Sequence, residues 1–299
     1  MFVFSGSSNQ KLAKKIAQNL KCKLGKVKLD RFPNGEARVR IKEKTANKTA
    51  IIVQSFSLPV DKHIIEFCLL CDALKRLGAK KIIAVIPWLG YSKQDKVFRS
   101  GEPLSVKVIT QIIQTAPFDK VIIFDLHNQS IIGFFDKPII QLSTQTLFLD
   151  FFKKIIKTDN FMVIAPDAGS IKNSTAFAGK LGLPIAYIDK ERDLLTGKVK
   201  IHGISKKITD KNLIIVDDMI STGSTLVETA KFLKKQGGKK IYVAATHHLF
   251  VPQVQAKLKA SPIDKLLISD TIENKSPSSK FLSIVSVAKL IADAIKDKM

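Results

Sequence analysis

Residues 212–238 read NLIIVDDMISTGSTLVETAKFLKKQGG. The opening run NLIIV is nearly all branched and apolar, which is typical of a strand buried on both faces of a parallel sheet. Two acids, Asp217 and Asp218, follow the strand; a Ser/Thr/Gly turn then leads into a helical pattern that ends at Gly237 and Gly238. Ligands of parallel α/β proteins bind beyond the carboxyl ends of the strands. The segment therefore predicts an α/β unit with a ligand site at its polar turn.

The same alternation of strand and helix runs along the whole chain. Short apolar runs typical of buried strands occur at 2–5, 49–54, 81–87, 120–125, 161–166, 184–189, 212–217 and 240–247, with helical patterns between them. A chain of 299 residues is long enough for two cores of roughly 150 residues each. We therefore predict an α/β protein with two doubly wound parallel-sheet domains, 1–143 and 144–299. The apolar spacing of the tail predicts a helix within 282–299, which needs a docking surface that the first domain can supply.

The net charge of +23 suggests that the chain binds polyanions or small phosphorylated ligands. The lysines are scattered over helix faces and helix ends without interleaved aromatic residues, so a solvated surface is favoured over a nucleic-acid footprint. The apolar runs are shorter than the roughly 18 residues that a spanning helix needs, so no membrane partner is expected.

The cysteines and the N-terminus indicate a cytoplasmic chain. Cys22, Cys68 and Cys71 cannot build a disulfide framework, which fits a reducing compartment. Cys68 and Cys71 lie on one face of a helical pattern with no second Cys/His pair nearby, so core packing is favoured over a zinc site. The N-terminal sequence places its apolar stretch before its lysines, the reverse of a secretory signal.

The polar turn after the strand at 212–217 predicts a phosphate site. Backbone N–H groups and hydroxyls at the start of a helix attract a phosphate; the residues that supply them are Ser221, Thr222, Gly223, Ser224 and Thr225. Asp217 and Asp218 would repel that phosphate unless they hold hydroxyl groups or a magnesium ion. A sugar phosphate complexed with metal satisfies both conditions, and a capped helix with two solvated acids is the simpler alternative. The pattern is neither GxxxxGK[ST] nor GxGxxG, which disfavours a nucleotide P-loop or a dinucleotide fold.

Four further polar segments mark the predicted edges of the sheets. They are RFPNGEARVRI (31–41), IPWLGYSKQDKVFRSGEPLSVK (86–107), DLHNQSIIGFFD (125–136) and the pair APDAG (165–169) with YIDKERD (187–193). Each also has a plain structural explanation: a hairpin, a surface loop, a hydrogen-bonded histidine, a helix cap or a solvated charge cluster. Lys190 and Arg192 are two residues apart in an extended segment, which predicts that they point to the same side.

The sequence VDDMISTGST (216–225) resembles the phosphoribosyl pyrophosphate loop shared by phosphoribosyltransferases and ribose-phosphate pyrophosphokinases. The four further segments resemble motifs of the ribose-phosphate pyrophosphokinase family in family order, over nearly the whole chain, whereas phosphoribosyltransferases would share the loop only. The resemblance implies a fold of the type I phosphoribosyltransferase kind. It also implies transfer of the β,γ-diphosphoryl group of Mg-ATP to the anomeric hydroxyl of ribose 5-phosphate, which gives phosphoribosyl pyrophosphate and AMP for nucleotide biosynthesis.

The resemblance also implies roles for particular residues. The residues implied to bind ATP are Phe32, Asn34, Gly35, Glu36, Lys93, Gln94, Asp95 and Arg99. Those implied to bind Mg²⁺ are His127 and Asp167, and the catalytic residues are Lys190 and Arg192. Those implied to bind ribose 5-phosphate are Arg192, Asp217, Asp218, Ser221, Thr222, Gly223, Ser224 and Thr225. Asn34 stands where the family usually has Asp, and Lys93 where it usually has Arg, so a carboxylate and a bidentate fork are lost. Family members place the site between their domains and assemble as homodimers or hexamers, so we expect a homo-oligomer.

Three other functions compete with this one. A phosphoribosyltransferase would consume phosphoribosyl pyrophosphate through the same loop. A regulatory paralogue without catalysis is disfavoured because Lys190, Arg192, His127 and Asp167 are all present. A basic nucleic-acid-binding protein would show salt-sensitive retention of DNA or RNA.

Overall fold

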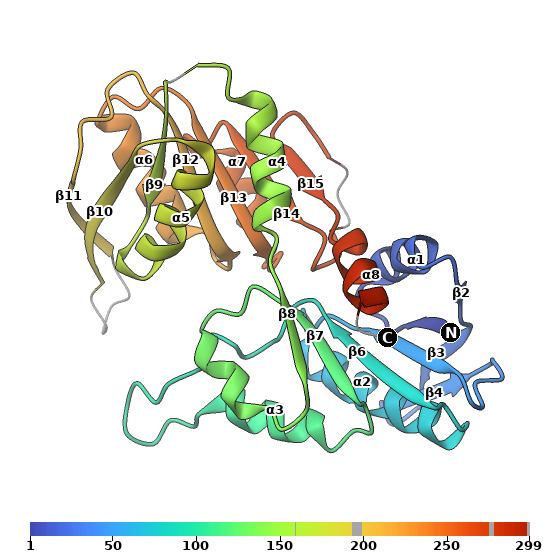
Figure 1. Ribbon diagram of the computed structural model, residues 1–299. Helices are drawn as coiled ribbons and strands as arrows, with labels where there is room; N and C mark the ends of the chain where they lie inside the picture. The colour runs from blue at the N-terminus through green and yellow to red at the C-terminus, as the bar shows by residue number, and fades with distance from the viewer. Residues whose placement is uncertain (159, 193–198, 275–277, 298–299) are drawn as a thin grey trace. The chain divides into compact units, whose positions relative to one another are not determined.

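The computed structural model describes residues 1–158, 160–192, 199–274 and 278–297, except for the side chains of 191, 192 and 199. The chain forms two compact units (Figure 1). Unit 1 comprises Met1–Ser143, Asp270–Lys275 and Ser286–Met299, and unit 2 comprises Thr144–Ser269 and Ser276–Val285. In the described part of the chain, no helix is both long and apolar enough to cross a membrane.

Unit 1 is built on a parallel sheet. Its described strands, in spatial order, are β2 (Lys23–Leu24), β1 (Phe2–Ser5), β5 (Thr49–Val53), β6 (Lys81–Ile86), β7 (Lys120–Phe124) and β8 (Ile139–Leu142). The helices are α1 (Gln10–Asn19), α2 (Val60–Arg76), α3 (Ser105–Gln114) and α8 (Ala288–Asp297). Strands β5, β6 and β7 are almost completely buried because their residues are apolar on both faces. Strand β8 belongs to this sheet, although no strand was predicted there from the sequence.

An antiparallel hairpin, β3 (Val27–Arg31) and β4 (Ala37–Ile41), follows β2. Val27, Leu29 and Val39 lie on one face of the hairpin and pack against the apolar core that α2 shares with the sheet. The turn at 32–36 is exposed. Burial of one face thus anchors the strands and leaves the tip in solvent.

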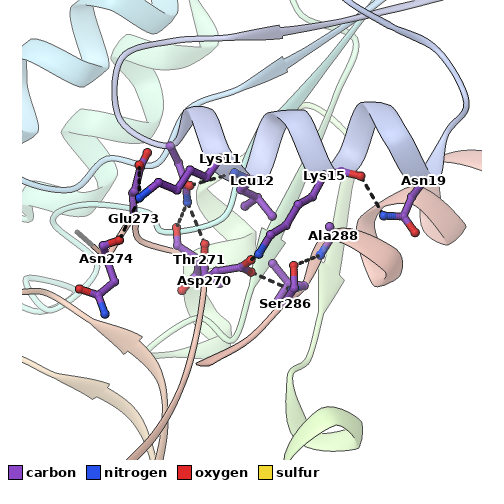
Figure 2. A network of polar contacts seen from close by, with 12 residues as sticks. Lys11, Leu12, Lys15, Asn19, Asp270, Thr271, Glu273, Asn274, Ser286 and Ala288 are labelled. Atoms are coloured by element: carbon purple, nitrogen blue, oxygen red, sulfur yellow. Dashed lines mark hydrogen bonds and ion pairs between the residues drawn. The ribbon is translucent and has the colours of Figure 1, made fainter. Parts of the chain in front are cut away.

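The tail and the segment 270–275 complete unit 1 beside α1 (Figure 2). The Asn9 side chain donates to the carbonyl of Asp270 at 2.8 Å, and Lys15 Nζ lies 2.8 Å from Asp270 Oδ2. Asp270 Oδ1 accepts the backbone N–H of Val287 at 2.8 Å, which ties the tail to the same network. The expected tail helix within 282–299 is α8, Ala288–Asp297, and the alternating residues Leu282–Val285 before it pair with β14 (Lys265–Ser269) as strand β15.

Unit 2 repeats this architecture. The strands that the structure describes, in spatial order, are β11 (Val199–Ile204), β10 (Ile185–Arg192), β9 (Phe161–Ala165), β12 (Asn212–Ile220), β13 (Ile241–His248), β14 (Lys265–Ser269) and β15. Only the β10–β11 pair is antiparallel among these strands. The helices are α4 (Gln145–Ile155), α5 (Ile171–Leu181), α6 (Ser224–Lys235) and α7 (Val254–Lys259).

Each face of the second sheet has its own apolar cluster. Residues of α6 and α7 pack with Ile215 and Val243, and residues of α4 and α5 pack with Val163 and Ile214. Helices therefore cover both faces, as a doubly wound sheet requires. Strand β12 is longer than predicted: it runs beside β13 to Ile220, so Asp217 and Asp218 lie within the strand rather than after it.

Candidate active site

Asp167 follows the end of β9 and organises the turn behind it. Its Oδ1 accepts the backbone N–H of Ser170 at 2.9 Å, and the Ser170 hydroxyl lies 3.2 Å from the backbone N of Asp167, so the two residues form a reciprocal cap. This is the structural role that the alternative explanation of Asp167 predicts. The other oxygen, Oδ2, lies 3.2 Å from Lys190 Nζ. The Asp167 carboxylate thus has one oxygen in the cap and the other paired with the Lys190 ammonium.

Lys190 reaches Asp167 from the neighbouring strand β10. Its side chain is 12% exposed, whereas that of Asp167 is 44% exposed. The pairing of β10 with β11 shifts register between Asp189 and Lys190 and resumes at Lys190–Ile201, an irregularity that is common beside functional sites. Arg192 ends β10, but its side chain lies outside the described part of the chain. The predicted common orientation of Lys190 and Arg192 stays a prediction.

Asp217 and Asp218 add two more acids on β12, the strand that pairs with the other edge of β9. The backbone N–H of Asp218 donates to Asp217 Oδ1 at 2.9 Å. Burial raises the pKa of the Asp217 carboxyl, and the charges of Asp218 and Asp167 raise it further. The structure thus brings Asp167, Lys190 and Asp217 together at one edge of the sheet. Such an edge favours a cation or a ligand that donates hydrogen bonds.

The predicted phosphate turn follows directly. Gly223 is the N-cap of α6 and adopts a left-handed conformation with φ of 67°. No acid occupies the first turn of α6, and its N-cap residue, Gly223, makes no side-chain cap bond. The N-terminal amides therefore combine with the positive end of the helix dipole, which favours an anion.

The turn of the β3–β4 hairpin carries the predicted adenine-binding residues in unit 1. Phe32 is 44% exposed, and the Arg38 guanidinium carbon lies 5.1 Å from its ring centroid. Asp30 accepts from Arg38 through both carboxylate oxygens, at 2.7 and 2.6 Å. This bidentate pair fixes the guanidinium against the ring, so Phe32 is held as an exposed stacking surface.

Asn34 has a turn-forming role in this hairpin. Its Oδ1 accepts the backbone N–H of Glu36 at 3.2 Å, and Gly35 has φ of 89°. An aspartate could accept the same bond, so the substitution of Asn for Asp preserves the turn. Glu36 is exposed at the end of the turn.

The loop that carries Lys93, Gln94, Asp95 and Arg99 is also in unit 1. Gln94 Oε1 accepts from the Ser105 hydroxyl at 2.6 Å, which ties the loop to the start of α3. Asp95 Oδ2 accepts from Asn128 Nδ2 at 2.7 Å. The loop is therefore joined to the segment that carries His127, and Lys93, Arg99 and His127 are exposed at the surface of the unit.

Two residues of these sites were missed from the sequence. Asn128 follows His127 in the segment DLHNQSIIGFFD, but its hydrogen bond to Asp95 could not be predicted from the sequence. Lys257 on α7 donates to the Ser224 hydroxyl at 2.6 Å, and no local pattern marks this lysine. Only the packing of α7 identifies it.

The described residues contain no group of three or more His, Cys, Asp or Glu side chains placed to hold a metal ion. Magnesium often keeps its waters and binds through one or two carboxylates and substrate phosphates, so the single, partly exposed carboxylate of Asp167 suits it better than it would suit zinc.

Two family models match the chain. One, described as the N-terminal domain of ribose phosphate pyrophosphokinase, matches residues 1–116; the other, described as a phosphoribosyl synthetase-associated domain, matches residues 195–298. The ribose-phosphate pyrophosphokinase of Thermotoga maritima is 35% identical over 99% of this chain and 94% of its own length. That of Aquifex aeolicus is also 35% identical, over 98% of this chain and 94% of its own length. The chain belongs to the ribose-phosphate pyrophosphokinase family.

A solved structure agrees with this family. The phosphoribosylpyrophosphate synthetase of Mycobacterium smegmatis is similar with a TM-score of 0.91 and 29% identity, over 99% of this chain and 98% of that one. The predicted α/β fold and the predicted family of transferases are therefore confirmed. The roles of single residues in a ribose-phosphate pyrophosphokinase stay predictions for this chain.

Proposed function

We propose that this chain is a ribose-phosphate diphosphokinase in which Lys190 and Asp167, together with Asp217 and Asp218, form the reaction centre of unit 2. The enzyme transfers the β,γ-diphosphoryl group of ATP to the anomeric hydroxyl of ribose 5-phosphate. The observation that carries the residue assignment is the 3.2 Å ion pair between the largely buried Lys190 side chain on β10 and Asp167, which follows β9. A cation held in this way is preorganised for charge that develops in a transition state.

Ribose 5-phosphate binds at the start of α6. The 5-phosphate occupies the turn of Ser221, Thr222, Gly223, Ser224 and Thr225, where the amide groups and the helix dipole attract it. Asp217 and Asp218 accept hydrogen bonds from the 2- and 3-hydroxyls. Burial and the charges of Asp218 and Asp167 raise the pKa of Asp217, and bound hydroxyl donors or a cation would offset these charges and favour its ionised form.

ATP binds through unit 1. Adenine stacks on Phe32, whose opposite side is supported by Arg38, and the turn at Asn34, Gly35 and Glu36 supplies polar groups for the base. Lys93, Gln94, Asp95 and Arg99 serve the triphosphate end. Their link to Asn128 through Asp95 supports a common role with His127.

Magnesium is the expected cofactor, with His127 and Asp167 as its protein ligands; when bound, it neutralises and orients phosphate oxygens. The protein contributes position and charge. The anomeric oxygen forms its bond to the β-phosphorus as the bond between that phosphorus and the bridging α-oxygen breaks, AMP leaves, and the hydroxyl proton passes to solvent. Lys190 and Arg192 offset the negative charge on the transferred group and on AMP.

Two further proposals concern the state of the protein. A cytoplasmic location is supported by three free cysteines. A homo-oligomer, dimer or hexamer, is supported by exposed apolar side chains on helices of unit 1, among them Ile65 and Leu69 on α2 and Val108 and Ile112 on α3.

The test is AMP formation by the purified protein from Mg-ATP with and without ribose 5-phosphate. AMP release that depends on the sugar supports diphosphoryl transfer. Consumption of phosphoribosyl pyrophosphate with a nucleobase, without AMP release from ATP, would indicate a phosphoribosyltransferase. Binding of ribose 5-phosphate without either reaction would indicate a regulatory paralogue.

A further inference from the structure

Helix α7 packs directly on the phosphate turn of unit 2. Gly223 is buried there, and a Cβ at this position would lie 3.2 Å from Leu258 Cδ2 and 3.4 Å from Val254 Cγ1. Both side chains belong to α7 and are almost completely buried. The apolar face of α7 thus fixes the position of the turn.

The same helix brings a cation to the turn. Lys257 is exposed, and its Nζ donates to the Ser224 hydroxyl at 2.6 Å. Ser224 is the first residue of α6, so this ammonium lies at the positive end of the helix dipole. An ammonium has three donors, and the bond to Ser224 uses one of them. The other two remain for a ligand or for water.

The charges around the turn show why a cation is useful there. A sugar phosphate carries nearly two negative charges at neutral pH, and the helix terminus offers only about half a positive charge. Asp217 and Asp218 lie on the strand that leads into the turn, and whatever negative charge they carry opposes the phosphate. A full positive charge next to Ser224 offsets this repulsion, and a charge-assisted bond is about twice as strong as a neutral one.

We propose that Lys257 is a phosphate-binding residue: its ammonium contacts a 5-phosphate oxygen of ribose 5-phosphate while it holds the Ser224 hydroxyl toward the same group. The inference rests on the proposed function, because it requires the phosphate of the sugar to occupy this turn. It adds a specificity determinant, since Lys257 distinguishes a phosphorylated sugar from a free one. It makes no contact with the diphosphoryl group and leaves ATP binding unchanged.

The experiment compares the full-length wild type with Lys257→Met, Lys257→Arg and Lys259→Met in steady-state AMP formation. Lys257→Met is expected to raise the KM for ribose 5-phosphate about 5- to 20-fold, with the KM for ATP and kcat within about twofold of wild type. Lys257→Arg keeps the charge and the donors, so it should recover most of the loss. Lys259 is also exposed on α7, so Lys259→Met removes an equal charge and should match the wild type.

The outcomes separate the inference from the proposed function. A wild type that forms no sugar-dependent AMP overturns both. An active wild type with an unchanged KM for ribose 5-phosphate in Lys257→Met overturns the role of Lys257 alone. Equal losses in Lys257→Met and Lys259→Met also overturn it, because they would reflect the total charge of the surface. Melting temperatures of all variants, expected to agree within a few degrees, exclude general unfolding as the cause.

Discussion

The ion pair of Lys190 and Asp167 shows how the two oxygens of one carboxylate can be used separately. Asp167 caps its own turn with one oxygen and meets Lys190 with the other. A largely buried ammonium is costly without a partner, so the carboxylate holds the Lys190 side chain in position before any substrate arrives. Ligands that compete for Asp167 would release Lys190 toward their phosphates.

Lys190→Ala is expected to lower kcat by about 10²-fold or more, because it removes a preorganised charge from the proposed reaction centre. Steady-state AMP formation measures this, with thermal unfolding to show that the variant folds. Lys235→Ala, an exposed lysine at the opposite end of α6, is the matched control and should retain full activity. Turnover that is unchanged in Lys190→Ala contradicts the catalytic role.

Gly223→Ala tests the turn itself at the same scale. The residue has φ of 67°, and its new Cβ would meet Leu258 at 3.2 Å. The left-handed backbone alone costs an alanine about 1–2 kcal/mol, and the contact displaces α7. We expect lower stability in urea unfolding and weaker ribose 5-phosphate binding. Gly179→Ala, a helical position with open space around it, should not destabilise the protein.

At the scale of elements, polar side chains gather where strands of the sheets end. His248 ends β13 and is 1% exposed; its Nδ1 accepts the Phe250 backbone N–H at 3.0 Å, and no partner for Nε2 is found in the described structure. The ring also stacks on Phe250, with centroids 4.2 Å apart. Burial lowers the pKa of His248 to about 4. The folded protein therefore holds this imidazole neutral over a range in which the unfolded chain would protonate it.

The sign of the pH dependence follows. The unfolded imidazole has a pKa of about 6.5, so between about pH 6.5 and 4 the unfolded state binds a proton that the folded state does not. The contribution of His248 to the free energy of unfolding is fully present above about pH 6.5 and is lost as the pH falls toward 4. The loss due to His248 is about 2 kcal/mol at pH 5.

Urea unfolding at pH 7.5 and 5 measures this loss. His248→Asn keeps an acceptor for the Phe250 N–H and removes the titrating ring, so it should show the smaller difference between the two pH values. His127→Asn removes an exposed imidazole and serves as the control. Equal differences in wild type and His248→Asn would refute the assignment.

Elements with a local sequence pattern could be predicted, whereas elements that depend on contacts with distant residues could not. Strands β5, β6 and β9 and their following helices have local apolar patterns, and the phosphate turn at 221–225 carries its own Ser/Thr/Gly pattern. Strands β8 and β15 were not predicted from the sequence, because each is short and depends on a neighbouring strand that is already in the sheet. The contact of Lys257 could not be predicted either, since its partner Ser224 is distant in sequence and is reached only through the packing of α7.

At the scale of the whole molecule, unit 1 is assembled from three separate pieces of the chain. Helix α8 contributes buried Ala288, Ile291, Ala292 and Ile295, and it packs on α1. Lys296 Nζ also donates to the carbonyl of Asn19 at 3.1 Å. The N-terminal helix is thus covered by the C-terminal one, and neither has a complete environment without the other.

Ile291→Ala should therefore destabilise the first unit by about 2–4 kcal/mol, because it leaves a cavity between the two helices. Hydrogen exchange is the measurement: amides of α1 should lose protection as strongly as those of α8. Lys289→Ala removes only an exposed partner of Asp293 and should change stability by less than about 0.5 kcal/mol. Loss of protection confined to α8 would contradict the packing.

This interleaving has a consequence for biosynthesis. A ribosome delivers β1 and α1 before the segments that cover α1, because residues 270–274 and 286–297 emerge only after β9–β14 have been made. Unit 1 is therefore completed after unit 2, whose sheet already has its last strand, β15, when residue 285 has been made. Nascent chains stalled before residue 286 should present an open apolar face on α1 to chaperones, and release of the full chain should remove it.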